Sequence, residues 1–192
     1  MTSKLEGEIM KAILAVTLAA TLLGAAFSPN ICLTLSLAQS SDSSDQSQSK
    51  PSIGLLRVPD VAKLREQTHG HVLVINFWAT WCHGCVGEFP DLVALDNQYR
   101  EKGVKIIGIS LDKTSDIDSK IVPFIKKSGG RFDILVPDMD DPQPIIDAVT
   151  KHWTGAMPAT FIFDQQGKLA YERFGVINRD QVIGVLDSML KS

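Results

Sequence analysis

Short β-branched apolar runs alternate with segments of helical periodicity along the C-terminal two thirds of the chain. The run at 72–77 (VLVINF) is apolar at nearly every position, as expected of a strand that is covered on both faces. Similar runs predict strands at 104–111 and 132–136. Phe89, Leu92, Asp96 and Tyr99 follow a helical period between the first two strands. Further helices are predicted over 117–128 and 144–153.

The end of the chain has a different pattern. Strands are predicted at 158–163 and 168–174, joined by a hairpin turn over Asp164–Gly167. Asn178 is placed to cap a final helix, with Gln181 as its capping-box partner. The buried face of that helix is predicted to comprise Val182, Ile183, Leu186 and Leu190. The order β-α-β-α-β-α-β-β-α predicts an α/β fold, a central mixed β-sheet flanked by helices on both faces.

The N-terminal part is set apart by the absence of charge from Ala12 to Ser41. The apolar run 12–27 has about the length of a signal-peptide core, so we expect residues 1–38 to be a signal peptide or a retained membrane anchor, two alternatives that the sequence leaves open. Met10 is a possible second start. The Ser-rich segment 39–52 is predicted to be a flexible linker, and 53–192 the folded domain, located outside the cytoplasm.

Composition narrows the class of partner and of scaffold. The chain has 192 residues, 44% of them hydrophobic, and a formal net charge of −3, which gives no basic excess for nucleic acid. Three cysteines are too few for a disulfide-stapled scaffold or a four-thiolate zinc site. Cys32 lies in the apolar N-terminal segment and is treated as incidental, which leaves Cys82 and Cys85 in the folded part.

The segment 76–85 (NFWATWCHGC) places these two cysteines where a strand ends and a helix begins. Unpaired N–H groups at a helix start stabilise negative charge, so the Cys82 thiol should have a lowered pKa, and a protonated His83 would favour its thiolate further. Cys85 is close enough to attack a mixed disulfide formed at Cys82. A zinc site would need two more ligands, and His69, His71 and His152 are expected to be surface histidines.

Trp81-Cys82-x-x-Cys85, followed much later by Met157-Pro158-Ala159-Thr160-Phe161, resembles the thioredoxin superfamily. The segments 76–81 and 85–90 are similar to the TlpA/ResA group of exported or membrane-anchored thiol-disulfide oxidoreductases. The resemblance implies a thioredoxin-like fold, an attacking Cys82, a resolving Cys85 and a cis peptide bond before Pro158. It also implies that the backbone of Met157 pairs with an extended client segment, and that Pro90 bends the first helix.

Two departures from the resemblance concern the chemistry. Asn76 stands where thioredoxin has a buried aspartate, and Glu88, one turn after Cys85, matches a carboxylate of the TlpA/ResA group that could replace it. Glu88 could instead be a simple helix-start charge. Gly84 stands where the group often has proline, so His83 and Gly84 are the residues expected to tune the redox potential.

Other residues near the motif are given simpler roles. Trp78 and Trp81 are expected to pack around the site rather than to bind a ligand of their own, and Trp81 is placed with Met157 and Pro158 on the side that meets the client. The acidic residues Asp138, Asp140 and Asp141 are interpreted as a solvated turn rather than a metal cluster.

The leading hypothesis is therefore an enzyme without a bound cofactor or metal that exchanges a Cys82–Cys85 disulfide with exported client proteins. The sequence does not give the direction of electron flow. The working hypothesis is that the protein reduces its clients with electrons supplied by a membrane redox relay partner. A peroxiredoxin-like thiol peroxidase is one alternative, although Ala79 occupies the position where that chemistry needs threonine. A copper-binding thioredoxin-fold chaperone is another, although its relatives separate their cysteines by three residues.

Overall fold

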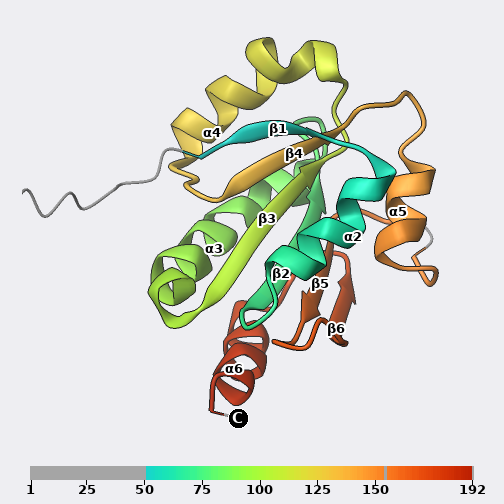
Figure 1. The fold of residues 1–192 in the computed structure, drawn as a ribbon. Coiled ribbons are helices and arrows are strands. Elements are labelled where there is room, and N and C mark those ends of the chain that lie inside the picture. Colours follow the sequence, from blue (N-terminus) through green and yellow to red (C-terminus); the bar gives the residue numbers. More distant parts are fainter. Residues whose placement is uncertain (1–50, 154, 192) are drawn as a thin grey trace, which may run out of the picture. The chain divides into compact units, whose positions relative to one another are not determined.

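The computed structural model describes residues 51–153 and 155–191. Its centre is a six-stranded mixed sheet with the strand order β1-β4-β3-β2-β5-β6 (Figure 1). The strands are β1 (Ile53–Leu56), β2 (Val72–Trp78), β3 (Val104–Ser110), β4 (Asp133–Pro137), β5 (Ala159–Phe163) and β6 (Leu169–Phe174). β1, β4, β3 and β2 are paired in parallel with one another, whereas β5 pairs antiparallel with both β2 and β6.

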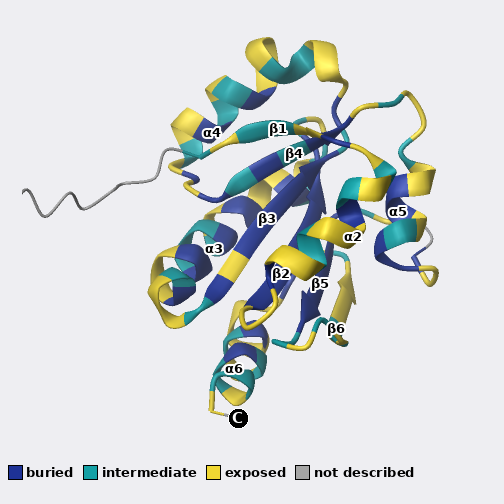
Figure 2. Cartoon of the chain, viewed as in Figure 1, coloured by how far each residue is buried: buried dark blue, intermediate teal, exposed yellow. Residues whose placement is uncertain are grey.

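β2 lies in the middle of the sheet, and every one of its residues is buried (Figure 2). It pairs in parallel with β3 and antiparallel with β5, with Trp78 opposite Ser110 and Phe77 opposite Ala159. A strand covered on both faces has no polar side to present to water, which explains why its sequence is a continuous apolar run. The carboxyl end of this strand is therefore held firmly in place.

Helices cover both faces of the sheet, as predicted. One face packs against α3 (His83–Tyr99), α4 (Val122–Ser128) and α6 (Arg179–Met189), with Phe89, Leu92 and Val182 in the shared core. The other packs against α2 (Val58–Gln67) and α5 (Gln143–Val149). Each face thus has its own apolar cluster, and the α/β prediction is confirmed.

Among the strands and α-helices of the described residues, two were not predicted from the sequence pattern, β1 and α2. β1 is an edge strand of four residues, and α2 buries only Val61, so neither has a strong periodic signal. The segment 117–128, predicted as one helix, consists of a π-helical turn (η3, Ile117–Ile121) followed by α4. A 3₁₀ turn (η2, Thr114–Asp116) precedes it. The predicted helix over 144–153 ends earlier, at Val149.

The C-terminal predictions are confirmed in their main features. Gly167 has φ 76° at the end of the β5–β6 turn, in the left-handed region that glycine adopts without strain. Asn178 Oδ1 accepts a hydrogen bond from Gln181 N at 3.0 Å and so caps α6. Val182 and Leu186 are buried, while Ile183 and Leu190 are partly buried against the same core.

The predicted signal peptide or anchor (1–38), Cys32 and nearly all of the linker (39–52) lie outside the described residues. Within the part of the chain that the structure describes, no helix is both long enough and apolar enough to span a membrane. The localisation inferred from residues 1–38 therefore stays a prediction.

Candidate active site

Cys82 and Cys85 form a disulfide at the carboxyl end of β2, with their Cα atoms 5.2 Å apart. Cys82 is the N-cap of α3, and its Sγ accepts a hydrogen bond from Cys85 N at 3.2 Å. Cys82 is partly exposed, whereas Cys85 is only 1% exposed. The pair therefore has an outer sulfur that a second protein can reach and an inner one that it cannot.

The start of α3 favours negative charge on the outer sulfur. The helix runs for 17 residues from His83, and its first turn contains no acidic residue. Its N-terminal N–H groups and dipole point toward Cys82 and stabilise an anion there. His83 is exposed on the same turn.

The Met157–Pro158 peptide bond is cis, as the resemblance implied, and it lies beside the cysteines. Antiparallel pairing sets Ala159 opposite Phe77, so the start of β5 meets the end of β2. A Cβ atom added at Gly84 would lie 3.4 Å from Pro158 Cδ and 3.6 Å from Val176 Cγ2. The cis-proline loop and the segment after β6 thus both flank the Cys82–Cys85 turn.

The two tryptophans of the motif differ in their surroundings. Trp78 is fully buried and packs against Phe89 and Phe124, with ring centroids 5.0 and 5.1 Å away. Trp81 is 64% exposed, so the expectation that it packs around the site, as Trp78 does, is wrong. It lies three residues after the end of β2 and directly before Cys82, so its exposed side chain offers apolar surface to a partner.

Glu88 lies on α3 one turn after Cys85 and is 1% exposed. Its Oε1 accepts a hydrogen bond from Asn76 Nδ2 at 2.8 Å, and its Oε2 accepts one from Ile177 N at 2.6 Å. Asn76 Nδ2 also donates to Thr160 Oγ1 at 3.0 Å. The carboxylate therefore joins the cysteine-bearing helix to β2 and to the segment after β6.

Burial raises the pKa of Glu88 above its ordinary value, and the negative charge of Asp91 adds to the rise. The hydrogen bonds from Ile177 N and Asn76 stabilise the carboxylate form and therefore act against this rise in pKa. A raised pKa lies closer to neutral pH, so the Glu88 carboxylate is a better proton acceptor there than an ordinary carboxylate. This environment is unlike that of an exposed helix-start carboxylate.

Asp112 and Thr80 form a contact that the sequence reasoning missed. Asp112 follows β3 and is 5% exposed, and its carboxylate accepts hydrogen bonds from Thr80 N at 2.8 Å and Thr80 Oγ1 at 2.6 Å. A signal was available, because parallel neighbours end at the same edge of the sheet. A polar residue directly after the run 104–111 is therefore expected near the residues that follow 72–77.

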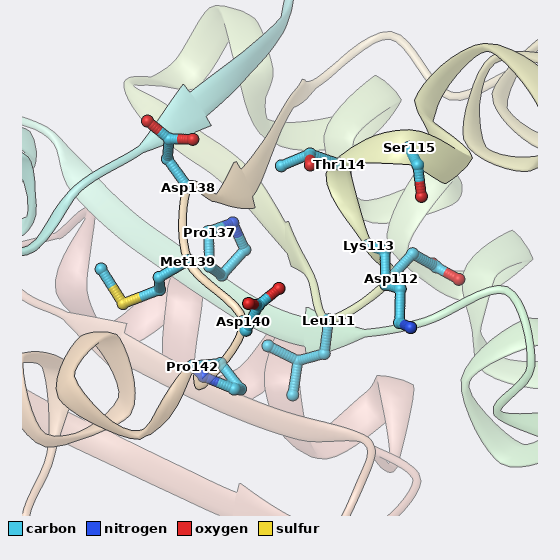
Figure 3. Close-up of a pocket in the computed structure, with 10 residues that line it drawn as sticks. All are labelled: Leu111, Asp112, Lys113, Thr114, Ser115, Pro137, Asp138, Met139, Asp140 and Pro142. Carbon is cyan, nitrogen blue, oxygen red and sulfur yellow. The ribbon is translucent and has the colours of Figure 1, made fainter.

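Asp112 also borders a hollow of about 620 Å³ between the loops that follow β3 and β4 (Figure 3). Asp138 and Asp140 are exposed on the β4 side of this hollow, opposite Lys113, and Asp141 is exposed just beyond it. Their exposure agrees with the solvated turn that was predicted. His69, His71 and His152 are exposed, also as predicted.

Together these features define a thioredoxin-like α/β protein with an accessible Cys-x-x-Cys disulfide at a helix start, a cis-proline beside it and a buried carboxylate behind it. A site of this kind can form a mixed disulfide at its outer sulfur and resolve it with its inner one.

The profile of the AhpC/TSA family matches residues 58–172, and the chain belongs to that family. It is similar to the thiol-disulfide oxidoreductase ResA of Bacillus thuringiensis, with 32% identity over 117 residues, 61% of this chain and 62% of the relative. ResA of Oceanobacillus iheyensis is 29% identical over 120 residues, 62% of this chain and 58% of the relative. The chain thus matches less than two thirds of the length of these curated relatives.

Solved structures show the same fold. A thiol:disulfide interchange protein of the thioredoxin family from Chlorobium tepidum superposes with a TM-score of 0.55 at 22% identity, over 65% of this chain and 83% of that one. A secreted thiol-disulfide isomerase from Corynebacterium glutamicum superposes with a TM-score of 0.57 at 20% identity, over 66% and 75%. These likenesses confirm the thioredoxin-like fold.

Proposed function

We propose that this protein is a thiol-disulfide oxidoreductase that exchanges its Cys82–Cys85 disulfide with client proteins. The observation that carries the proposal is the disulfide itself, which caps α3 with its partly exposed sulfur and keeps the other sulfur buried. The similarity to ResA supports it independently. No bound cofactor is needed, because the two thiols supply both electrons.

The exchange takes place in two steps. The Cys82 thiolate attacks one sulfur of a client disulfide, forms a mixed disulfide and releases the other client sulfur as a thiolate that takes up a proton. The Cys85 thiol then loses its proton and attacks Cys82 Sγ, which releases the second client sulfur. The client disulfide is reduced to two thiols, and the Cys82–Cys85 dithiol is oxidised.

Glu88 is the residue we propose as the proton acceptor for Cys85. It lies one turn away on α3, the spacing at which side chains are neighbours, and burial has raised its pKa. Asn76 contributes no titratable group and instead positions the carboxylate through its amide.

The client is proposed to bind as an extended segment across Met157, Pro158 and Trp81. Trp81 offers apolar area beside the outer sulfur, and the Met157 backbone can pair with the segment as an added strand. His83 and Gly84, the residues between the cysteines, are proposed to set the reduction potential.

We propose further that the protein acts outside the cytoplasm, exported or anchored by residues 1–38, and that a membrane redox partner keeps it reduced. The uncharged apolar segment supports the location. If the protein works as a reductase, the reduction potential should lie near the roughly −270 mV of thioredoxin, whereas a value near about −120 mV would identify an oxidase.

The experiment that tests the activity is to trap the mixed disulfide. Cys85→Ser should accumulate a covalent adduct with a disulfide-containing peptide, because the resolving thiol is gone. The matched variant Cys82→Ser should form none, because its remaining thiol is buried. Adducts formed equally by both variants, or by neither, would refute the proposal.

The peroxidase alternative is not favoured by the surroundings of Cys82. Ala79 has no hydroxyl, and the hydroxyl of Thr80 donates to Asp112. Hydrogen peroxide consumption in the presence of a reductant tests this alternative directly. A copper titration of the reduced protein tests the metal-chaperone alternative.

A further inference from the structure

We propose that Asp112 is a positioning residue for disulfide exchange, which holds Thr80 and thereby keeps Cys82 at the N-terminus of α3. The inference deepens the proposed function, on which it rests, by assigning a role to a residue outside the Cys-x-x-Cys turn. It concerns the loop between β2 and α3, residues 79–82.

The first step is the attachment of Asp112. Its backbone N donates to Ser110 Oγ at 3.2 Å, and Ser110 Oγ donates to Asp112 Oδ2 at 2.7 Å. Ser110 is fully buried in β3, so the carboxylate is fixed to the strand rather than to a mobile loop. With the two bonds from Thr80, the carboxylate accepts three hydrogen bonds while almost completely removed from water. Hydrogen bonds to a buried charged acceptor are the stronger ones.

The second step is the place where Asp112 acts. The ladder between β2 and β3 ends with Leu111 N donating to Trp78 O at 2.8 Å. Beyond that point the loop has left the ladder, and Thr80 is held instead through both its backbone N–H and its hydroxyl. The Asp112 carboxylate thus extends the attachment of β2 to β3 by two further hydrogen bonds.

The third step connects Thr80 to Cys82. Cys82 N donates to Ala79 O at 3.2 Å, so residues 79–82 form a tight turn, and Thr80 is one of its two central residues. The other central residue, Trp81, is 64% exposed, so the hydrogen bonds of Thr80 are the observed attachment of the turn. Holding Thr80 therefore fixes the turn, and the turn sets the position of Cys82 Sγ over the first N–H groups of α3. Stabilisation of the Cys82 thiolate depends on that position, because the effect of the helix falls off within its first turn.

Thr80→Val is the variant that isolates positioning from charge. It keeps the size and branching of the side chain and the backbone N–H bond but removes the hydroxyl bond to Asp112 Oδ1. The titratable groups at the start of α3 (His83, Cys85 and Glu88) and in the loop after β3 (Asp112) are not substituted in this variant. A change in the pKa of Cys82 then reports its position over the helix start.

The measurement is the alkylation rate of Cys82 against pH in the full-length reduced chain, with peptide mapping to separate Cys82 from Cys85 and Cys32. Thr80→Val should raise the pKa of the Cys82 thiol by about half a unit and slow its alkylation about threefold at pH values below that pKa. Thr80→Ser, which has the hydroxyl that Thr80→Val lacks, should show the wild-type pKa and alkylation rate.

Thr114→Val is the matched control, because it makes the same chemical change in the same region. The Thr114 side chain is exposed at the hollow of Figure 3 and has no hydrogen bond within the described residues, so it should leave the Cys82 profile unchanged. Ser110→Ala, which loosens Asp112 itself, should shift the Cys82 pKa in the same direction as Thr80→Val by a smaller amount.

A wild-type Cys82 profile in both Thr80→Val and Ser110→Ala, whatever their stability, would overturn the proposal and leave Asp112 a purely structural role. Failure of Thr80→Ser to restore the profile would overturn it as well. The readout needs no client, so it stays informative if the chain exchanges no disulfides. Absence of disulfide exchange would refute the proposed function and not the positioning of Cys82.

Discussion

Glu88→Gln removes the titratable group behind the cysteines while keeping a hydrogen-bonding side chain of the same size. The amide oxygen of the substituted side chain can accept from Ile177 N as Glu88 Oε2 does. Its amide nitrogen then needs an acceptor, and Asn76 Oδ1, which is buried without a partner among the described residues, becomes available when the Asn76 amide is flipped. The variant should therefore fold and differ from the wild type chiefly in the absence of a titrating group.

The expected magnitude follows from the role of Glu88 as proton acceptor. A positioned general base contributes roughly 10²- to 10⁴-fold. Both Glu88 oxygens already accept hydrogen bonds, which weakens the base. We therefore expect the resolving step to slow by about 10- to 100-fold, at or below the low end of that range. Attack by Cys82 should be largely unchanged, because its thiolate is stabilised by the helix start and not by Glu88.

A stopped-flow assay with a nitrobenzoate disulfide reagent separates the two steps. Each step releases one coloured thiolate, first on attack by Cys82 and then on attack by Cys85. Cys85→Ser should show the first phase alone and so identifies it. Glu88→Gln should show both phases, with only the second slowed.

The pH dependence has a definite sign. Glu88 acts as a carboxylate, so the second phase of the wild type should slow as pH falls through the raised pKa of Glu88. Glu88→Gln should lack this limb. Asp91→Asn is the matched control on the same helix: removing the negative charge that helps raise the pKa of Glu88 should move the limb to lower pH without lowering the plateau rate.

The same pKa affects stability in the oxidised protein, where neither cysteine titrates. A folded-state pKa above the unfolded value means that the folded state binds more protons between the two. The free energy of unfolding should therefore fall as pH rises from the ordinary Glu value of 4.5 through the raised pKa. The stabilisation from protonated Glu88 is fully present below pH 4.5, and Glu88→Gln should lack this slope.

The kinetic result decides the role of Glu88. If the second stopped-flow phase of Glu88→Gln keeps its wild-type rate across about pH 5 to about pH 9, Glu88 is only a helix-start charge and not a proton acceptor.

Three further predictions concern packing, titration and export. Gly108→Ala should lower the free energy of unfolding by about 1–3 kcal/mol in denaturant titrations, because the new Cβ would lie 2.9 Å from both Ile134 Cδ1 and Trp78 Nε1. Gly87→Ala, with nothing within 4 Å of its Cβ, should raise it by roughly 0.5–1 kcal/mol; equal effects would contradict the packing. Burial and the Asp187 hydrogen bond raise the pKa of Tyr99 to about 12, so ultraviolet titration should show it still protonated well above the ordinary tyrosine value of 10.0. A reporter that works only in the cytoplasm, fused after Ser52, should be inactive, and strong activity would mean that residues 1–38 do not direct export.

The sheet could be predicted from the sequence because its central strands are buried on both faces. The runs 72–77 and 104–111 leave no polar alternation to misinterpret, and each lies within one residue of the observed strand. β1 and α2 were missed for the opposite reason, since an edge strand of four residues and a helix with one buried residue produce little pattern. Periodicity records burial, so elements that bury little are predicted poorly.

The site could be predicted only as far as its chemistry is local in sequence. Cys82 and Cys85 lie three residues apart, and the cis bond at Pro158 followed from a family resemblance. The bond from Ile177 N to Glu88 spans 89 residues, and the bonds from Thr80 to Asp112 span 32. Such contacts depend on which loops the strand order brings together. For Asp112 the parallel order of the two strands gives a signal, whereas nothing in the sequence pattern connects Ile177 with Glu88.

The measurement that tests the central claim most directly is the alkylation of the reduced protein by iodoacetamide, with Cys82 and Cys85 quantified separately by mass spectrometry. The structure places Cys82 at the exposed start of α3 and leaves Cys85 only 1% exposed. We predict that Cys82 is alkylated first near neutral pH, with an apparent pKa below the ordinary thiol value of about 8.5, and that Cys85 stays largely unmodified. Equal rates at the two thiols, or faster modification of Cys85, would contradict the assignment of Cys82 as the attacking cysteine.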